Sequence, residues 1–247
     1  AEIDVWFEKN MPNDATMPLF RTSKELGIAL SFGYAELTPD GLHYNTSILT
    51  DKRGNIIGKY RKVHLPGHSE YDHDRAFQHL EKRYFLPGDM GFPVWRNLNA
   101  MMGMCICNDR RWPEVYREMG LQGVELLMLG YNTPSVNSQM SDEGLEKRLY
   151  HSELCMTAGA YQNSTWVIGV AKAGSEDGHP LIGGSIIVDP DGNVVAKASS
   201  EDDELIVHAC DMEACNFGKS TIFDFARHRR IEHYTRISTQ TGVVRPD

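Results

Sequence analysis

Hydrophobic and polar residues follow one another along this chain at spacings that predict both helices and strands. Residues 16–27 place apolar side chains at helical intervals and end on Gly27, a common helix terminator, so they predict a helix. A shorter helix is predicted for residues 112–120, and a long one for residues 142–163. The side chains expected on the buried face of the long helix are those of Leu145, Leu149, Met156 and Ala160.

Apolar runs between these helices predict strands. The runs are residues 28–37, 101–107, 124–130, 165–171 and 203–209. Two polar turns flanked by apolar segments predict hairpins, one at residues 51–55 and the other at residues 189–192. Strands that alternate with helices indicate an α/β protein, and the hairpins make its sheet mixed. Two sheets packed face to face with helices outside fit the same pattern, and periodicity does not choose between the two arrangements.

Composition narrows the class of protein. The chain has 247 residues, of which 41% are hydrophobic, and we expect one domain over residues 1–247. A net charge of −9 argues against a nucleic-acid or membrane surface as partner, and no apolar run is long enough to span a bilayer. Five cysteines, an odd number at irregular spacing, favour a reducing compartment, so we expect a cytoplasmic protein.

Cys107 is the first candidate for chemistry. It lies at the end of an apolar strand and just before a predicted helix, where α/β proteins bind ligands. A helix start and nearby arginines stabilise a thiolate, the form of cysteine that acts as a nucleophile. A buried structural cysteine is the alternative. Cys105 points to the same strand face, about 6.6 Å away along an extended chain, so a disulfide between the two is not expected.

Other polar residues surround this position in the sequence, each with a plain structural alternative. Lys62 follows a hairpin strand and could be a solvated surface lysine. Four histidines fill the next loop region and could form a metal site or a hydrogen-bonded pocket wall; they are His64, His68, His73 and His79. The absence of a compact His-x-x-x-His pair makes the metal site the weaker interpretation.

Two further groups of polar residues follow strand ends. Arg110 and Arg111 could be surface charges, or they could bind a substrate carboxylate through paired N–H groups. Asn132 and Thr133 end the next strand and would face the same crevice, with groups suited to orienting an amide or ureido substrate.

Four segments together resemble the nitrilase superfamily of carbon–nitrogen hydrolases over essentially the whole chain. They are KYRKVHLPGH (residues 59–68), FQHLEKRYF (residues 77–85), CNDRRWPE (residues 107–114) and GYNTP (residues 130–134). The extended agreement is similar to the N-carbamoyl-D-amino acid amidohydrolase branch in particular. The resemblance implies a four-layer α-β-β-α sandwich, assembled as a homodimer or homotetramer, that needs no metal or organic cofactor.

The resemblance also implies roles for single residues. Cys107 would be the nucleophile, Lys62 would stabilise the oxyanion and Glu81 would support Lys62. His64 and His79 would contribute to substrate binding. The family's general-base glutamate has no match in the chain, so we expect it upstream of Ala1, in the family's opening strand–helix–strand segment.

The activity implied by the resemblance is hydrolysis of an N-carbamoyl-D-amino acid to the amino acid, carbon dioxide and ammonia. Arg110 and Arg111 would bind its carboxylate, and the Asn108 backbone N–H would join Lys62 at the oxyanion. A β-ureido acid, an N-carbamoyl amine or a simple amide stays open as substrate. A non-catalytic homologue and a metal-dependent hydrolase also stay open.

Overall fold

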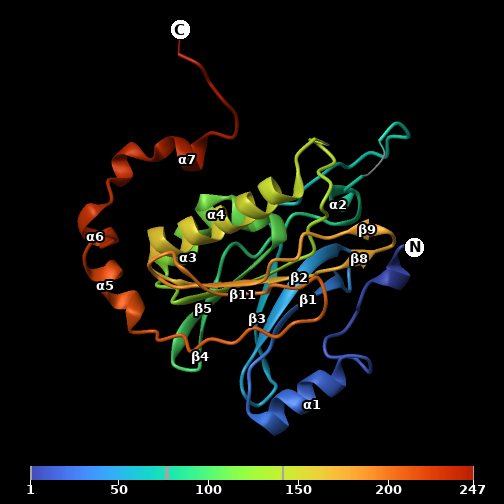
Figure 1. Cartoon of the computed structure of the whole chain (residues 1–247), viewed down its shortest axis with the longest axis horizontal. Coiled ribbons are helices and arrows are strands. Elements are labelled where there is room, and N and C mark those ends of the chain that lie inside the picture. The colour runs from blue at the N-terminus through green and yellow to red at the C-terminus, as the bar shows by residue number, and fades with distance from the viewer. Residues whose placement is uncertain (1, 76–77, 141, 247) are drawn as a thin grey trace.

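Two β-sheets face each other in the centre of the molecule (Figure 1). The computed structural model describes residues 2–75, 78–140 and 142–246. The smaller sheet consists of β1 (Ser31–Leu37), β2 (His43–Thr50) and β3 (Ile56–Arg61), all antiparallel and in that order. The predicted hairpin at residues 51–55 is therefore confirmed: it joins β2 to β3.

The larger sheet is mixed and has the order β11-β10-β7-β6-β5-β4. Its strands are β4 (Val94–Asn97), β5 (Ala100–Ile106), β6 (Leu126–Tyr131), β7 (Trp166–Ala171), β10 (Ile186–Val188) and β11 (Val194–Lys197). β5, β6 and β7 run parallel, and the flanking strands pair antiparallel. The parallel strands match three of the predicted apolar runs, because strands covered on both faces need apolar side chains on both. A separate small ladder pairs β8 (Ser175–Glu176) with β9 (His179–Pro180).

Helices cover the outer faces of both sheets, which gives four layers (Figure 1). α1 (Met17–Leu26) packs on the smaller sheet through an edge-on contact of Phe20 with Phe32. α3 (Pro113–Leu121) and α4 (Leu145–Asn163) cover the larger sheet. The fold is therefore the expected α-β-β-α sandwich.

The two sheets approach each other closely at one point. A side chain at Gly58 would place its Cβ 2.7 Å from the ring of Trp95 on the facing sheet. Glycine at this position lets the aromatic ring lie against the backbone, and any larger residue would push the layers apart.

The C-terminal part of the chain leaves the body and curves past the helical layer (Figure 1). It carries α5 (Ala214–Ser220), α6 (Phe225–His228) and α7 (Thr235–Thr239). The remaining short helices are α2 (Glu81–Tyr84), η1 (Asp4–Trp6), η2 (Cys107–Arg111) and η3 (Ile231–His233). Arg117 of α3 lies 4.1 Å from the ring centre of Phe225, which ties this arm to the body. None of the described helices combines the length and the apolar character needed to cross a membrane.

Most predicted helices are confirmed, with small shifts at their ends. Gly27 terminates α1 in the left-handed conformation, at φ 67°. α3 continues one residue beyond Gly120. On α4, Met156 and Ala160 are fully buried and Leu149 is partly buried, but Leu145, the first residue of the helix, is exposed.

The strand predicted at residues 203–209 is wrong. The segment is extended, but no strand pairs with it among the residues that the structure describes. Leu205 and Val207 are strongly exposed, whereas Ile206 between them packs on the core. Alternation of apolar residues predicts an extended backbone, and it carries no information about whether a neighbouring strand is available.

Candidate active site

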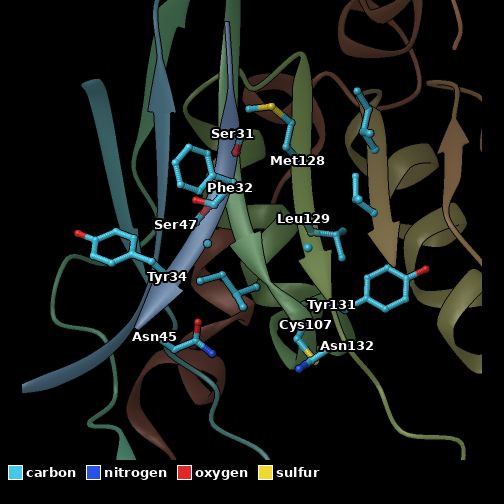
Figure 2. A pocket seen from close by; sticks show the side chains of 15 residues that line it. Ser31, Phe32, Tyr34, Asn45, Ser47, Cys107, Met128, Leu129, Tyr131 and Asn132 are labelled. Carbon is cyan, nitrogen blue, oxygen red and sulfur yellow. The ribbon is translucent and has the colours of Figure 1, made fainter. Parts of the chain in front are cut away.

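Cys107 stands at a sharp bend where β5 ends. Its φ of 48° lies in the left-handed region, which is strained for a residue with a side chain, and the residue before it is fully extended. Figure 2 shows Cys107 beside Asn132, at the ends of the neighbouring strands β5 and β6. The predicted α-helix does not follow at once: Cys107 opens the 3₁₀ helix η2, and α3 begins only at Pro113.

The electrostatic surroundings of Cys107 favour its thiolate. Burial raises the pKa of this thiol, but the Lys62 and Arg110 cations outweigh burial and hold the pKa below its usual value. At Cys105, two residues earlier, burial and the Asp109 charge outweigh the same two cations, and the pKa of its thiol lies well above the usual value. All five cysteines are free thiols. Of Cys105 and Cys107, Cys107 is therefore the one equipped to act as a nucleophile.

Lys62 is buried, so the surface-lysine alternative is wrong. Its side chain is 1% exposed, and its Nζ donates to both carboxylate oxygens of Glu81 at 2.7 and 2.8 Å. Asn45 donates to the same carboxylate at 2.7 Å. His79 Nε2 lies 3.6 Å from its other oxygen, and burial holds the pKa of His79 low. Glu81 thus fixes the lysine whose charge acts on Cys107.

Asp109 is a buried carboxylate that the sequence analysis did not single out. It accepts four hydrogen bonds, from the backbone N–H of Ile106 at 3.0 Å and that of His64 at 2.9 Å, from His64 Nδ1 at 2.9 Å and from the Tyr60 hydroxyl at 2.7 Å. The indication in the sequence is the charge of Asp109, because a carboxylate two residues after the predicted buried strand 101–107 has to find hydrogen-bond partners.

His64 is held away from the cavities that adjoin Cys107. Its ring stacks between Phe92 and Trp112, with centroid distances of 5.9 and 4.7 Å. Its carbonyl oxygen accepts a hydrogen bond from the Asn108 side chain at 3.1 Å. The predicted contact of His64 with substrate stays a prediction, and the geometry assigns His64 to the support of the cysteine bend.

Arg110 and Arg111 lie in different surroundings. Arg110 is 1% exposed, stacks on the Tyr131 ring at 4.4 Å and donates to Cys107 O at 2.7 Å. Its other donors reach Ser152 and Thr133, both at 3.1 Å. Arg110 therefore donates to three neutral oxygens of the protein, and its Nη1 also lies 3.8 Å from Cys107 Sγ.

Arg111 is exposed and lines a small cavity of about 40 Å³ beside Cys107. No ion pair or hydrogen bond engages it among the described residues. The pKa of Arg111 is lowered, first because surrounding protein atoms desolvate its guanidinium and then because Arg110 carries a like charge. The described lining includes His79, Arg110, Arg111 and Arg148 but no Asp or Glu. Glu143 pairs with Arg148 at 3.0 Å, whereas Arg110 and Arg111 have no carboxylate partner among the described residues.

A second, larger cavity of about 610 Å³ also opens onto Cys107 (Figure 2). Its lining is mostly apolar and includes Phe32, Ile106, Met128, Leu129, Ile168 and Val170. Asn132 lines this cavity, whereas Thr133 lines the smaller one, where its hydroxyl lies 3.8 Å from Cys107 Sγ. The two polar residues after β6 therefore line different cavities, both of which adjoin Cys107.

The predicted histidine cluster does not assemble. His79 approaches Glu81 and His64 approaches Asp109, but within residues 2–75, 78–140 and 142–246 no three metal-binding side chains are grouped to hold an ion.

Comparisons with known proteins agree with this geometry. A family model described as carbon-nitrogen hydrolase matches residues 4–219. An N-carbamoylputrescine amidase of Arabidopsis thaliana is 32% identical over 95% of this chain and 76% of its own length. A citrullinase of Francisella tularensis is 30% identical over 78% of this chain and 65% of its own. A solved carbon-nitrogen hydrolase of Helicobacter pylori superposes with a TM-score of 0.78 at 26% identity, covering 93% of this chain and 77% of the other.

Proposed function

The chain belongs to the carbon-nitrogen hydrolase family, and we propose that it hydrolyses N-carbamoyl-D-amino acids to the D-amino acid, carbon dioxide and ammonia. Hydrolysis of C–N bonds other than peptide bonds is the general activity that the family match and the relatives support. We propose in addition that the substrate carries a carboxylate and has the D configuration.

The observation that carries the proposal is the cationic wall beside Cys107. Arg111 projects there without a counter-ion among the described residues, and Arg110 adds a buried positive charge behind it. The described lining holds no carboxylate that would attract a cation. A substrate that carries a carboxylate close to its scissile carbonyl would engage both Cys107 and Arg111.

The reaction begins at Cys107. Its thiolate attacks the ureido carbonyl carbon, and the carbonyl oxygen becomes an oxyanion. Lys62 Nζ and the Asn108 backbone N–H stabilise that charge, which is absent from the ground state. Asn132 and Thr133, which line the two cavities beside Cys107, would orient the ureido group.

Collapse of the tetrahedral intermediate breaks the bond to the terminal nitrogen, which takes a proton and leaves as ammonia. The sulfur then carries the remaining carbonyl as a thioester. Water attacks this carbonyl, the C–S bond breaks, and the released carbamate loses carbon dioxide to give the amino acid. Glu81 is engaged by Lys62 and Asn45, so the role of general base falls to the glutamate that the family resemblance implies.

An N-carbamoyl amine is the second candidate substrate. It is favoured by several relatives named N-carbamoylputrescine amidase, which are about 30% identical to this chain. A cationic substrate would place its charge near Arg111, where like charges repel. A β-ureido acid keeps the carboxylate and differs only in its distance from the carbonyl.

One assay tests the proposal: ammonia release by the purified protein from matched substrates. The set comprises D- and L-N-carbamoyl forms of one amino acid, a β-ureido acid and N-carbamoylputrescine. We expect the D-amino acid derivative to be hydrolysed with the highest kcat/KM; its configuration rests on the sequence resemblance alone. A preference for N-carbamoylputrescine would identify an N-carbamoyl amine, rather than an N-carbamoyl amino acid, as the substrate. A protein inert toward all four compounds would support a non-catalytic homologue.

A further inference from the structure

The carboxylate of Asp109 joins the cysteine bend to the segment that carries Lys62. On the bend, it accepts from the backbone N–H of Ile106, the residue before Cys107. On the lysine segment, it accepts from Tyr60 and His64, which stand two residues before and two residues after Lys62. One buried side chain therefore contacts both sides of Lys62 and the residue next to the sulfur.

Each oxygen of Asp109 has two donors. Oδ1 accepts from the backbone N–H and Nδ1 of His64, both at 2.9 Å. Oδ2 accepts from the Ile106 N–H at 3.0 Å and from the Tyr60 hydroxyl at 2.7 Å. The side chain is fully buried, so its charge depends on these four donors for the solvation that water would otherwise provide.

The arrangement requires a carboxylate rather than an amide. Both oxygens face a backbone N–H that cannot rotate away. An asparagine in this place would turn its NH₂ group against one of those N–H donors whichever way its amide is oriented. The bend or the lysine segment would then have to move, and a buried donor would lose its acceptor.

Cys107 itself needs support of this kind. Its φ of 48° is unfavourable for a residue with a side chain and persists only where the surroundings hold it. A second link between the same two segments runs from the Asn108 side chain to the carbonyl of His64 at 3.1 Å. The contacts on both sides of Cys107 thus lead to the lysine segment.

We propose that Asp109 is a positioning residue that fixes the distance and direction between the Cys107 sulfur and the Lys62 ammonium. The role rests on the proposed function in so far as Cys107 and Lys62 act as nucleophile and oxyanion donor. Asp109 contacts neither sulfur nor substrate, so it acts through the placement of these two groups.

The test is a double-mutant cycle on kcat, with the variants Asp109→Asn, Lys62→Ala and their combination. Asp109→Asn should lower kcat at least ~30-fold in the wild-type background and change KM less than ~3-fold, because the oxyanion contact exists only in the transition state. In the Lys62→Ala background the same substitution should lower kcat less than ~3-fold, since the contact is already lost. Equal losses in both backgrounds would overturn the proposal and leave Asp109 a fold-stabilising residue.

A readout without substrate separates this proposal from the proposed function. Lys62 lowers the pKa of Cys107, so displacement of the lysine should raise it. The pH dependence of Cys107 alkylation by iodoacetamide, followed on the Cys107 peptide by mass spectrometry, reports that pKa. We expect Asp109→Asn to slow alkylation at pH 7 by at least ~10-fold in wild type but not in Lys62→Ala. An unchanged rate in the wild-type background would refute the proposal even if no substrate were found.

Two further variants guard against a folding defect. Tyr60→Phe removes one of the four donors and keeps the carboxylate, so it should fold and show a smaller shift in the same direction. Asp51→Asn removes a carboxylate that accepts three hydrogen bonds in the β2–β3 turn, away from Cys107. Asp51→Asn should lower Tm without changing the pH profile of Cys107 alkylation. If the alkylation profile changed in step with Tm in every variant, the proposal that Asp109 positions Cys107 and Lys62 would be refuted.

Discussion

The hydroxyl of Thr133 lies 3.8 Å from the sulfur of Cys107, and the same oxygen accepts a hydrogen bond from Arg110 at 3.1 Å. Because Arg110 donates a hydrogen bond to this oxygen, the hydroxyl hydrogen of Thr133 is free to form a hydrogen bond with the sulfur. The contact links a buried cation to the candidate nucleophile through one side chain, and it stabilises the charged form of the thiol.

Thr133→Val should therefore raise the pKa of Cys107, because valine keeps the shape and removes the donor. A raised pKa lowers the thiolate fraction at neutral pH, so the acid limb of the kcat/KM profile should move to higher pH. The pH–rate profile and the pH dependence of Cys107 alkylation measure the shift. Thr133→Ser, which retains the hydroxyl, is the matched control, and equal shifts in both variants would argue against the hydrogen bond.

Cys107→Ser should abolish turnover, since a serine hydroxyl does not ionise near neutral pH. Cys105→Ser should retain most activity, because burial raises the pKa of Cys105 and keeps it protonated. Ammonia release by the two variants makes the comparison. An inactive Cys105 variant beside an active Cys107 variant would reverse the assignment of the nucleophile.

Lys62→Ala should lower kcat by about 10²–10³-fold with little change in KM, the usual result of removing an oxyanion donor. The variant also leaves Glu81 buried without its cation, so Lys62→Ala/Glu81→Gln is measured alongside it to separate the two effects. Steady-state kinetics of both variants, scaled to the fraction of folded protein, give the result. A normal kcat in the double variant would exclude Lys62 from the reaction.

Arg111→Ala should remove most of the preference for a carboxylate over its carboxamide analogue. We expect a loss of about 10- to 100-fold, because a hydrogen bond to a charged group contributes about 1.5–3 kcal/mol. Arg111→Lys should recover little, since an ammonium lacks the planar fork. Kinetics on the acid and the carboxamide test this, with the exposed Arg53→Ala as control. If Arg111→Ala kept the preference, an amide or N-carbamoyl amine would become the better substrate.

Glu36→Gln should change how stability depends on pH. Burial alone would raise the pKa of Glu36, but hydrogen bonds from Arg61, Lys59 and Thr46 lower it from 4.5 to about 2. A depressed folded-state pKa stabilises the protein above pH 4.5, and this contribution is lost as the pH falls toward 2.

Denaturant unfolding between pH 2 and 7 tests the effect. The variant should lose about 2–3 kcal/mol of unfolding free energy at pH 7 and little at the acid end. Parallel curves for the variant and the wild type would show that the carboxylate is not selectively stabilised in the folded state.

The sequence predicted the layers better than it predicted the contacts within the site. Apolar runs such as residues 124–130 became buried strands because burial on both faces requires apolar side chains throughout. The strand predicted at residues 203–209 was wrong because strand pairing depends on a neighbouring strand from elsewhere in the chain. Periodicity reports how a segment is buried, and it does not identify its partner.

The two arginines show the same limit of sequence-based prediction within the candidate active site. Arg110 and Arg111 are adjacent in sequence, and both were predicted to bind the substrate carboxylate. A 3₁₀ helix turns by about 120° per residue, so neighbouring side chains leave it in different directions. Arg110 is consequently buried against Tyr131, while Arg111 reaches the cavity. Asp109 was missed for a related reason, since three of its four donors belong to Tyr60 and His64, which lie far away in the sequence.

Arg110 is buried with no carboxylate partner among the described residues, and its Nη1 lies 3.8 Å from Cys107 Sγ, so a thiolate formed at Cys107 would serve as its counter-ion. In the proposed reaction this balance alternates. When the sulfur becomes part of a neutral thioester, the guanidinium is left uncompensated, and the site's electrostatic potential turns more positive at the stage when water must attack. The next anion formed there, the oxyanion of the hydrolytic step, restores neutrality, and release of the product returns the negative charge to sulfur. A single immobile cation can in this way favour the anionic species of both halves of the cycle without moving.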